Sequence, residues 1–219
     1  NEVKNTVDQI LGNKTSKVLL YGVDSLEIKQ KTAKSNLIRF ALVGSICYRK
    51  GADVFVDAIK LLKSDVRNKA QFIVVGDKSQ SEESYYNELI AASNQINELE
   101  VLESMPINEL LEAYSGYDVI VSASRADPMP IVITYGLMFS KLCVCSDAIG
   151  TASLIEHGKN GIIFKSEDPV ELAQIVEAIV LSPQDFELCG GNARRVYESH
   201  LSIESFEEGL KSLIEPTVN

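Results

Sequence analysis

The sequence predicts an α/β fold with a parallel central sheet, because two features run through most of the chain. Short apolar runs alternate with helix-length amphipathic stretches from residue 37 onward, which is the pattern of repeated strand–helix units. Three of the apolar runs end at Gly44-Ser45, Gly76-Asp77 and Ser146-Asp147, residues that favour the turn from a strand into a helix. We therefore expect a Rossmann-like domain of three layers, with about six parallel strands joined by right-handed crossovers.

The expected strands are short apolar runs, typical of parallel strands that are buried on both faces. They cover residues 37–43, 72–75, 100–102, 119–121, 142–145 and 161–164, with a further short strand at 17–20. The expected helices cover residues 3–11, 52–62, 81–96, 108–114, 131–139, 170–181, 183–198 and 203–214. Asn108 and Asp168 are expected to be helix N-caps.

The chain is expected to divide near residue 36. Residues 25–36 are polar and rich in lysine, without an apolar period, which is typical of a linker. We interpret residues 1–36 as the end of a preceding domain followed by an interdomain linker, and residues 37–219 as the Rossmann-like domain. Too few residues precede the linker to form a domain, so we expect a further part of the protein upstream.

The composition argues against several classes of protein. A net charge of −10 and an isoelectric point near 4.8 disfavour a nucleic-acid partner, which needs a basic surface to neutralise phosphates. No apolar run approaches the roughly 20 residues that span a bilayer. The four cysteines form no C-x-x-C pair, so we expect reduced thiols in a cytoplasmic protein.

The first candidate site is the turn after the first expected strand. Gly44 ends the strand, Arg49 and Lys50 follow, and Gly51 stands just before the next helix. Backbone N–H groups at a helix start, together with two cations, suit a diphosphate. The Gly-Lys-Ser/Thr of a Walker loop is absent. The same residues also fit an ordinary strand–helix turn with a solvated Arg-Lys pair.

The second candidate site is the acidic loop after the fourth expected strand. Pro128 and Pro130 have no N–H, so the N–H donors of this loop come from Asp127, Met129 and Ile131. Such a loop can orient a carboxylate toward sugar hydroxyls, and its N–H groups can meet an anion beside the following helix. Asp127 fits equally well as the N-cap of that helix.

Residues 150–153 form a third candidate site, because a glycine followed by small hydroxyl residues allows close approach of a phosphate. The same residues also fit a plain capped helix. His157 and His200 are far apart in the sequence, and the absence of a Ser/His/Asp or Cys/His arrangement argues against a nucleophilic hydrolase. No cluster of residues calls for a metal ion, and no cofactor is expected.

Several segments match, in order, the motifs of one enzyme family. They are FALVG (40–44) with Lys50-Gly51, IVVGD (73–77), AYSGYDVIVS (113–122), DPMPIV (127–132), and CVCSD (143–147) with GKNGIIF (158–164). On these motifs, residues 37–214 resemble the C-terminal, donor-binding domain of family 4 retaining glycosyltransferases, the glycosyl transferases group 1 of the GT-B fold. In that family two domains close on a nucleotide sugar, and the sugar passes to an acceptor held by the other domain.

The resemblance implies a role for each matched residue. Lys50 and Arg49 would pair with the donor diphosphate and Asp127 would contact the donor sugar, which makes these three the expected catalytic residues. The other expected donor-binding residues are Gly44, Ser45, Met105, Pro128, Met129, Pro130, Ile131 and Tyr135. Among them, the N–H groups of residues 129–131 would contact sugar and phosphate, and Met105 would line the pocket for the base.

Three positions depart from the family pattern. Ser45 stands where the family usually has arginine, Tyr135 where it has the glutamate that accepts the ribose hydroxyls, and Ser153 near a further glutamate. Losing one charge-assisted hydrogen bond lowers affinity about ten- to a hundredfold. The departures motivate an alternative, a degenerate glycosyltransferase-like module that acts as a non-catalytic partner or scaffold. A nucleotide-dependent epimerase of related fold is a third interpretation, against which the lack of a suitably placed His and Glu set argues.

The resemblance as a whole implies a retaining glycosyltransferase that makes a polysaccharide or a similar glycan. Its expected partners are a nucleotide-sugar donor, its own N-terminal domain and a glycan or lipid-linked acceptor, without nucleic acid. The full-length protein is expected in the cytoplasm or attached peripherally to the inner face of the membrane. By themselves, these residues are expected to bind the donor without transferring the sugar.

Overall fold

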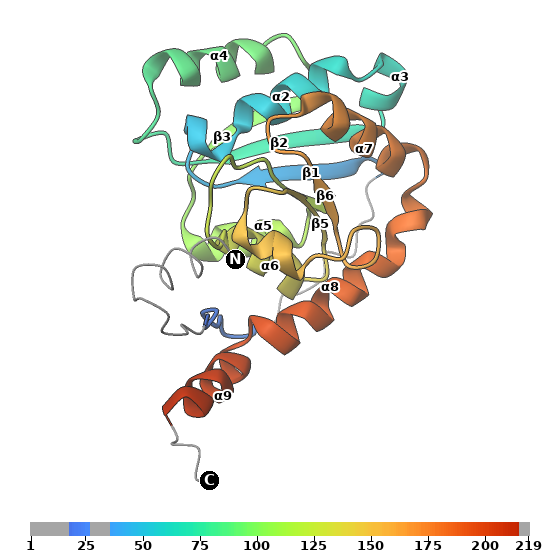
Figure 1. Ribbon diagram of the computed structural model, residues 1–219. Helices are drawn as coiled ribbons and strands as arrows, with labels where there is room; N and C mark the ends of the chain where they lie inside the picture. Colours follow the sequence, from blue (N-terminus) through green and yellow to red (C-terminus); the bar gives the residue numbers. More distant parts are fainter. Residues whose placement is uncertain (1–17, 27–35, 215–219) are drawn as a thin grey trace.

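The computed structural model describes residues 18–26 and 36–214 and has a single central sheet (Figure 1). Its six strands are β1 (Ile38–Val43), β2 (Ala70–Gly76), β3 (Leu99–Glu103), β4 (Val119–Ser122), β5 (Leu142–Ser146) and β6 (Ile162–Phe164). They lie in the order β3-β2-β1-β4-β5-β6, and every pairing is parallel. The predicted fold class, including the number of strands, is confirmed.

The helices of the described residues alternate with the strands. The α-helices are α2 (Ala52–Leu61), α3 (Ser64–Arg67), α4 (Glu83–Ser93), α5 (Ile107–Tyr114), α6 (Ile131–Met138), α7 (Pro169–Leu181), α8 (Glu187–His200) and α9 (Ile203–Ile214). The short 3₁₀-helices are η1 (Tyr48–Lys50), η2 (Gly150–Leu154) and η3 (Pro183–Phe186). Short strand–helix connections of this kind place helices against the sheet.

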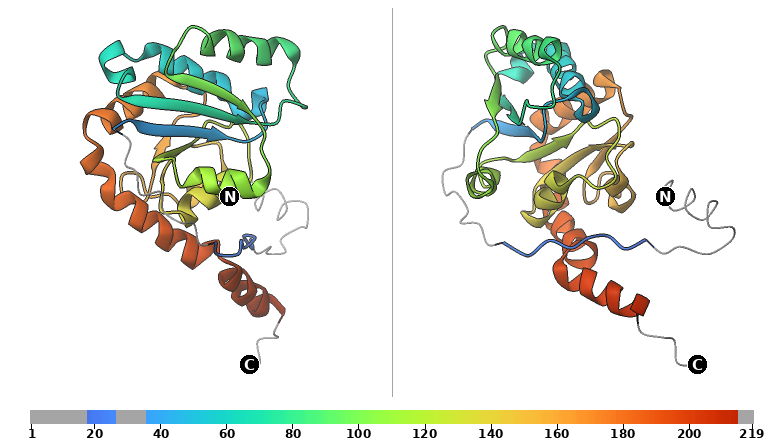
Figure 2. Two further views of the ribbon diagram at one scale, coloured as in Figure 1. Left: turned by 180° about the vertical axis from the view of Figure 1, so that it is seen from behind. Right: turned by 90° about the vertical axis from the view of Figure 1, so that its left-hand side faces the viewer.

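The core has two halves, one on each face of the sheet, because side chains alternate along each strand. In β1, Phe40 and Leu42 point into the half that is covered by α2, α3, α4 and α7. Ala41 and Val43 point into the other half, which is covered by α5, α6 and α8. Figures 1 and 2 show the three layers that result, with the sheet between the two groups of helices.

The strand order places a topological switch point between β1 and β4. From β1 the chain continues outward to β2 and β3, and it then returns to add β4 on the other side of β1. The two connections therefore leave β1 and β4 on opposite faces of the sheet. Ligands of open α/β sheets bind in the crevice that this arrangement opens at the carboxyl ends of the strands.

Some expected element boundaries are wrong. Helix α5 begins at Ile107 with Pro106 as its N-cap, so Asn108 lies inside the first turn rather than capping it. The expected helix at 183–198 is divided into η3 and α8. Residues 18–20 form no strand, while residues 3–11 and 17 lie outside the described residues. The N-cap at Asp168 is confirmed, because its carboxylate accepts a hydrogen bond of 2.9 Å from the N–H of Glu171.

The segment 18–26 lies against the junction of α8 and α9. The N–H of Val23 donates to the carbonyl of Leu201 at 2.9 Å, and the Tyr197 hydroxyl donates to the carbonyl of Val23 at 2.7 Å. Beyond this junction α9 extends away from the sheet (Figure 1). In the part of the chain that the structure describes, no helix combines the length and the apolar character needed to cross a membrane.

Two adjacent glycines of α8 are expected to respond in opposite ways to alanine. A Cβ on Gly190 would lie 2.3 Å from the carbonyl oxygen of Ser140, whereas a Cβ on Gly191 would meet nothing within 4 Å. We expect Gly191→Ala to raise the free energy of unfolding by about 0.5–1 kcal/mol through helix propensity. Gly190→Ala should lower it by about 1–3 kcal/mol through overpacking. Urea denaturation measures both changes, and a common sign would contradict this description of the packing between α8 and Ser140.

Candidate functional site

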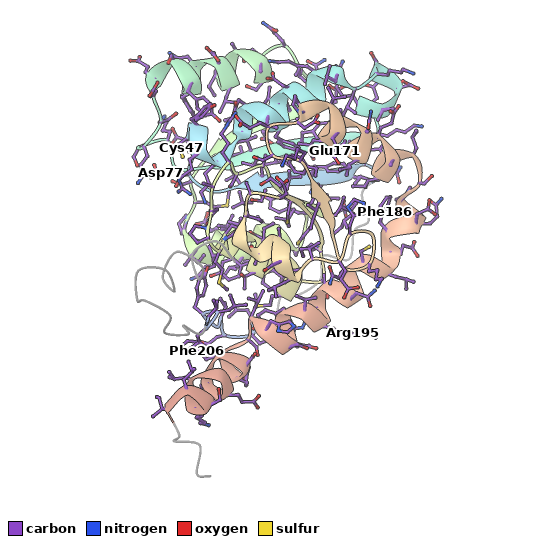
Figure 3. All side chains as sticks on the ribbon, in the orientation of Figure 1. Cys47, Asp77, Glu171, Phe186, Arg195 and Phe206 are labelled. Carbon is purple, nitrogen blue, oxygen red and sulfur yellow. The ribbon has the colours of Figure 1, made fainter. Side chains whose placement is uncertain are left out.

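The turn after β1 is anchored to the end of β2. The N–H of Gly44 donates to the carbonyl of Val75 at 3.0 Å, and the N–H of Ile46 donates to the carbonyl of Asp77 at 2.7 Å. Figure 3 labels Cys47 and Asp77, which lie together at this end of the sheet. The turn then forms η1 and ends at Gly51, whose φ of 71° is in the left-handed region. The chain thereby enters α2 with Arg49 and Lys50 at its start.

The turn after β1 is also joined to the loop after β4. The N–H of Arg125 donates to the carbonyl of Arg49 at 2.8 Å. In the reverse direction, the Arg49 guanidinium donates through Nη1 to the carbonyl of Ala126 at 2.9 Å. These two hydrogen bonds hold the two candidate loops side by side at the switch point.

Lys50 and Asp127 meet between these two loops. The ammonium group of Lys50 donates to Oδ2 of Asp127, and the two side chains are 17% and 10% exposed. Nη1 of Arg49 lies 3.7 Å from the same oxygen, but the Arg49 side chain is 51% exposed. The structure therefore brings together the three residues expected to be catalytic, while their roles stay predictions.

Asp127 is not the N-cap of α6. The N-cap is Pro130, and the carboxylate of Asp127 instead accepts a hydrogen bond of 3.2 Å through Oδ1 from the N–H of Met129. The carboxylate thus stabilises its own loop on one side and pairs with Lys50 on the other. The N–H of Met129 is consequently engaged within the loop, so this expected donor to a sugar would first have to leave Asp127.

Two further segments lie beside the loop that carries Asp127. The N–H of Gly150 donates to the Asp127 carbonyl at 2.8 Å, which places the third candidate site beside the second. The hydroxyl of Ser153 donates to the carbonyl of Gly150 at 2.8 Å, within η2. The N-cap of η2 is Ile149, whose side chain makes no capping hydrogen bond. The hydroxyl of Tyr21 donates to the carbonyl of Met129 at 2.8 Å. Burial and the nearby carboxylate of Asp127 raise the pKa of the Tyr21 phenol, so it remains a hydrogen-bond donor at neutral pH.

The remaining expected donor-binding residues lie at different distances from this centre. Gly44 and Ser45 belong to the turn after β1, while Pro128, Pro130 and Ile131 belong to the loop after β4 and the start of α6. Tyr135 of α6 packs in an aromatic cluster, with its ring centroid 6.0 Å from that of Tyr114, the last residue of α5, and 6.5 Å from that of Phe139. Met105 follows the edge strand β3, which lies two strands from β1. At a strand spacing of about 4.8 Å, β3 is about 10 Å from β1.

Arg125 is a residue of the site that sequence reasoning missed. It lies two residues before Asp127, and its guanidinium donates to both carboxylate oxygens of Asp53, at 2.9 and 2.6 Å. It also donates to Glu167 at 2.9 Å. The only sequence signal that could have found Arg125 is its position in the same loop as Asp127, because Asp53 and Glu167 are far away along the chain.

A half-open cavity of about 620 Å³ lies at the opposite, amino-terminal edge of the sheet. Arg39, Asp118, Lys141 and Phe186 are among its lining residues, and Figure 3 shows Phe186 at the far end of the sheet from Cys47. Burial lowers the pKa of Lys141. No candidate residue lines this cavity, and we do not assign the function to it.

The described residues also contain no group of three or more His, Cys, Asp or Glu side chains that could hold a metal ion. At the switch point, Lys50 and Arg49 are the cations that contact Asp127.

The fold agrees with a family match. Residues 24–196 match the family described as "Glycosyl transferases group 1". The match covers most of the chain, and the protein belongs to this family. An uncharacterised glycosyltransferase of Methanocaldococcus jannaschii is 22% identical over 213 residues, which make up 97% of this chain and 57% of that protein. The resemblance seen in the sequence motifs is confirmed.

Solved structures show the same fold. HepE of Anabaena in complex with UDP-glucose has a TM-score of 0.72 and 21% identity, covering 82% of this chain and 49% of that chain. Sucrose-phosphate synthase of Thermosynechococcus elongatus has a TM-score of 0.78 and 15% identity, covering 96% of this chain and 55% of that chain. At these identities the likeness shows the GT-B fold. The chain spans 49–57% of the length of these three proteins.

Proposed function

We propose that this chain binds a nucleotide-diphosphate sugar and is the donor-binding domain of a retaining glycosyltransferase. The contact between Lys50 and Asp127 at the carboxyl ends of β1 and β4 carries the proposal. A nucleotide sugar presents a dianionic diphosphate directly joined to a sugar that is rich in hydroxyls. A cation and a carboxylate held next to each other in one crevice suit both parts of that ligand at once.

The chemistry assigned to these residues is electrostatic. During transfer, the bond between the sugar C1 and the diphosphate oxygen breaks, and negative charge develops on that oxygen. An ammonium group has three N–H donors, and Lys50 uses one of them on Asp127. The others can meet the diphosphate, with Arg49 as a second cation. Groups that are fixed where charge develops lower the barrier most effectively, and Asp127 would orient the sugar by accepting from its hydroxyls.

We further propose that transfer requires a second domain, which would hold a glycan or lipid-linked acceptor. The chain spans about half the length of these relatives. In the family that the sequence motifs resemble, a second domain holds the acceptor. By themselves the 219 residues should therefore bind donor without transferring sugar. HepE is in complex with UDP-glucose, which makes UDP-sugars the first donors to test.

Calorimetric titration with UDP-, GDP- and dTDP-sugars tests the proposal. We expect one nucleotide class to bind, and the corresponding free hexose, which lacks the diphosphate, to give no heat under the same conditions. Loss of the family's ribose-binding glutamate at Tyr135 would weaken affinity about ten- to a hundredfold, so the titration should extend to millimolar ligand. If none of these nucleotide sugars bound at that concentration, the alternative of a non-catalytic partner or scaffold would be favoured.

A further inference from the structure

The guanidinium of Arg125 is held by several contacts within the protein. Its Nη1 and Nη2 donate to the two oxygens of Asp53, and its Nε donates to Glu167. Nη1 also donates to the carbonyl of Tyr48 at 2.5 Å, and the guanidinium carbon lies 3.7 Å from the Tyr48 ring centroid. A guanidinium has five N–H donors, and at least four of them are engaged in this way. Arg125 is therefore poorly placed to serve as a phosphate ligand.

The contacts of Arg125 lie on both sides of the Arg49-Lys50 pair. Tyr48 immediately precedes the pair, Asp53 follows it in the first turn of α2, and the N–H of Arg125 donates to the carbonyl of Arg49. A single side chain thus clamps the turn after β1 from before and after Lys50. The same residue belongs to the loop that carries Asp127, so the clamp joins the two halves of the site.

The far side of the clamp is fixed as well. The Tyr85 hydroxyl, from α4, donates to Oδ1 of Asp53 at 2.8 Å and accepts from the N–H of Asp53 at 3.1 Å. Burial opposes ionisation of Asp53, but the hydrogen bonds from Arg125 and Tyr85 outweigh it and lower the pKa of this carboxyl. Asp53 is therefore ionised at neutral pH, and the bidentate pair with Arg125 has the planar geometry in which arginine differs most from lysine.

Given the proposed function, on which this inference rests, we propose that Arg125 is a positioning residue. Through Asp53, Glu167 and the carbonyl of Tyr48, it holds Lys50 at the distance from Asp127 that a diphosphate and its sugar require. It does so without contacting the ligand.

The direction in which Asp53→Asn changes UDP affinity distinguishes a positioning role from a purely electrostatic one. Asp53→Asn removes a negative charge close to a site that binds an anion, so electrostatics alone would make UDP bind more tightly. Under the positioning role, the same variant loosens Arg125 and makes UDP bind more weakly. Asp53 is partly exposed, so this conservative change should leave the chain folded.

The experiment measures the dissociation constant of UDP by calorimetry for wild type, Arg125→Met, Arg125→Lys and Asp53→Asn. We expect Arg125→Met to weaken binding about tenfold, the effect of misplacing one charge-assisted hydrogen bond. Arg125→Lys should recover only part of the loss, because a lysine cannot form the bidentate pair. Arg67→Met is the matched control, since it removes another partly buried ion pair, with Glu98, and should leave UDP binding unchanged.

A double substitution separates positioning from general destabilisation. In a Lys50→Ala background, Arg125→Met should weaken UDP binding by less than about twofold, because coupled residues are not additive. Wild-type affinity in Arg125→Met, tighter binding in Asp53→Asn, or full additivity with Lys50→Ala would overturn the inference while leaving the proposed function intact.

Hydrogen exchange of the ligand-free chain provides a test that does not depend on UDP. Arg125→Met should speed amide exchange in residues 48–51 and 125–127, whereas Arg67→Met should not. If wild type fails to bind UDP, the proposed function is weakened and the exchange result alone decides the inference. Unchanged exchange in both segments would overturn it.

Discussion

Replacement of Lys50 by alanine is expected to weaken nucleotide-diphosphate binding about ten- to a hundredfold, the worth of one charge-assisted hydrogen bond. Lys50 is much less exposed than Arg49, the other cation expected to meet the diphosphate, and it is already oriented by Asp127. The protein as a whole carries a net charge of −10, so this local cation also offsets a general repulsion of anions. Titration of UDP into wild type and Lys50→Ala measures the change.

Lys60→Ala is the matched control for this prediction. It removes the same charge from the same region of sequence, but Lys60 lies in the last turn of α2 and pairs at the surface with Asp57. Helix α2 runs back from the carboxyl edge of the sheet, so Lys60 is remote from the crevice. Equal losses in the two variants would mean that only net charge matters, and this result would contradict the assignment of the diphosphate to Lys50.

Replacement of Gly51 by alanine is expected to lower the free energy of unfolding by about 3 kcal/mol, through two effects. Gly51 has a φ of 71°, and its Cβ would lie 2.0 Å from the carbonyl oxygen of Ala123. That carbonyl belongs to the buried chain directly after β4, so relief of the clash would push the two loops of the site apart. For a chain of this size the melting temperature should fall by about 6–12 °C, which calorimetry can measure.

Gly158→Ala isolates the backbone part of this effect. Gly158 has a φ of 78°, yet a Cβ there would meet nothing within 4 Å. Gly158→Ala should therefore lower the free energy of unfolding only by the cost of placing alanine in the left-handed conformation, about 1–2 kcal/mol. If Gly51→Ala and Gly158→Ala lowered the free energy of unfolding equally, the chain after β4 would move to accommodate the new methyl group at no cost. The close approach of Gly51 to Ala123 would then not restrain the site.

The fold and the centre of the site could be predicted from local sequence. Continuous apolar runs such as residues 37–43 are typical of buried parallel strands, and ligand sites lie at the carboxyl ends of such strands. This rule placed the turn of Lys50 and the loop of Asp127 at the same edge. The structure adds what the rule does not contain, which is that β1 and β4 are direct neighbours.

The contacts around this centre could not be predicted, because they join residues that are distant in the sequence. Tyr21 was expected beside a short strand, but its hydroxyl reaches the Met129 carbonyl across 108 residues. Arg125 reaches Asp53 across 72 residues. Asp127 is of a residue type that commonly caps helices, but α6 begins only at Ile131 and its N-cap is Pro130.

Amide chemical-shift mapping during a titration with UDP tests the central claim most directly. We expect the largest shifts in residues 44–51 and in the amides of Asp127, Met129 and Ile131, on either side of the contact between Lys50 and Asp127. Shifts that gather instead around the cavity at the amino-terminal edge, near Lys141 and Phe186, would contradict it.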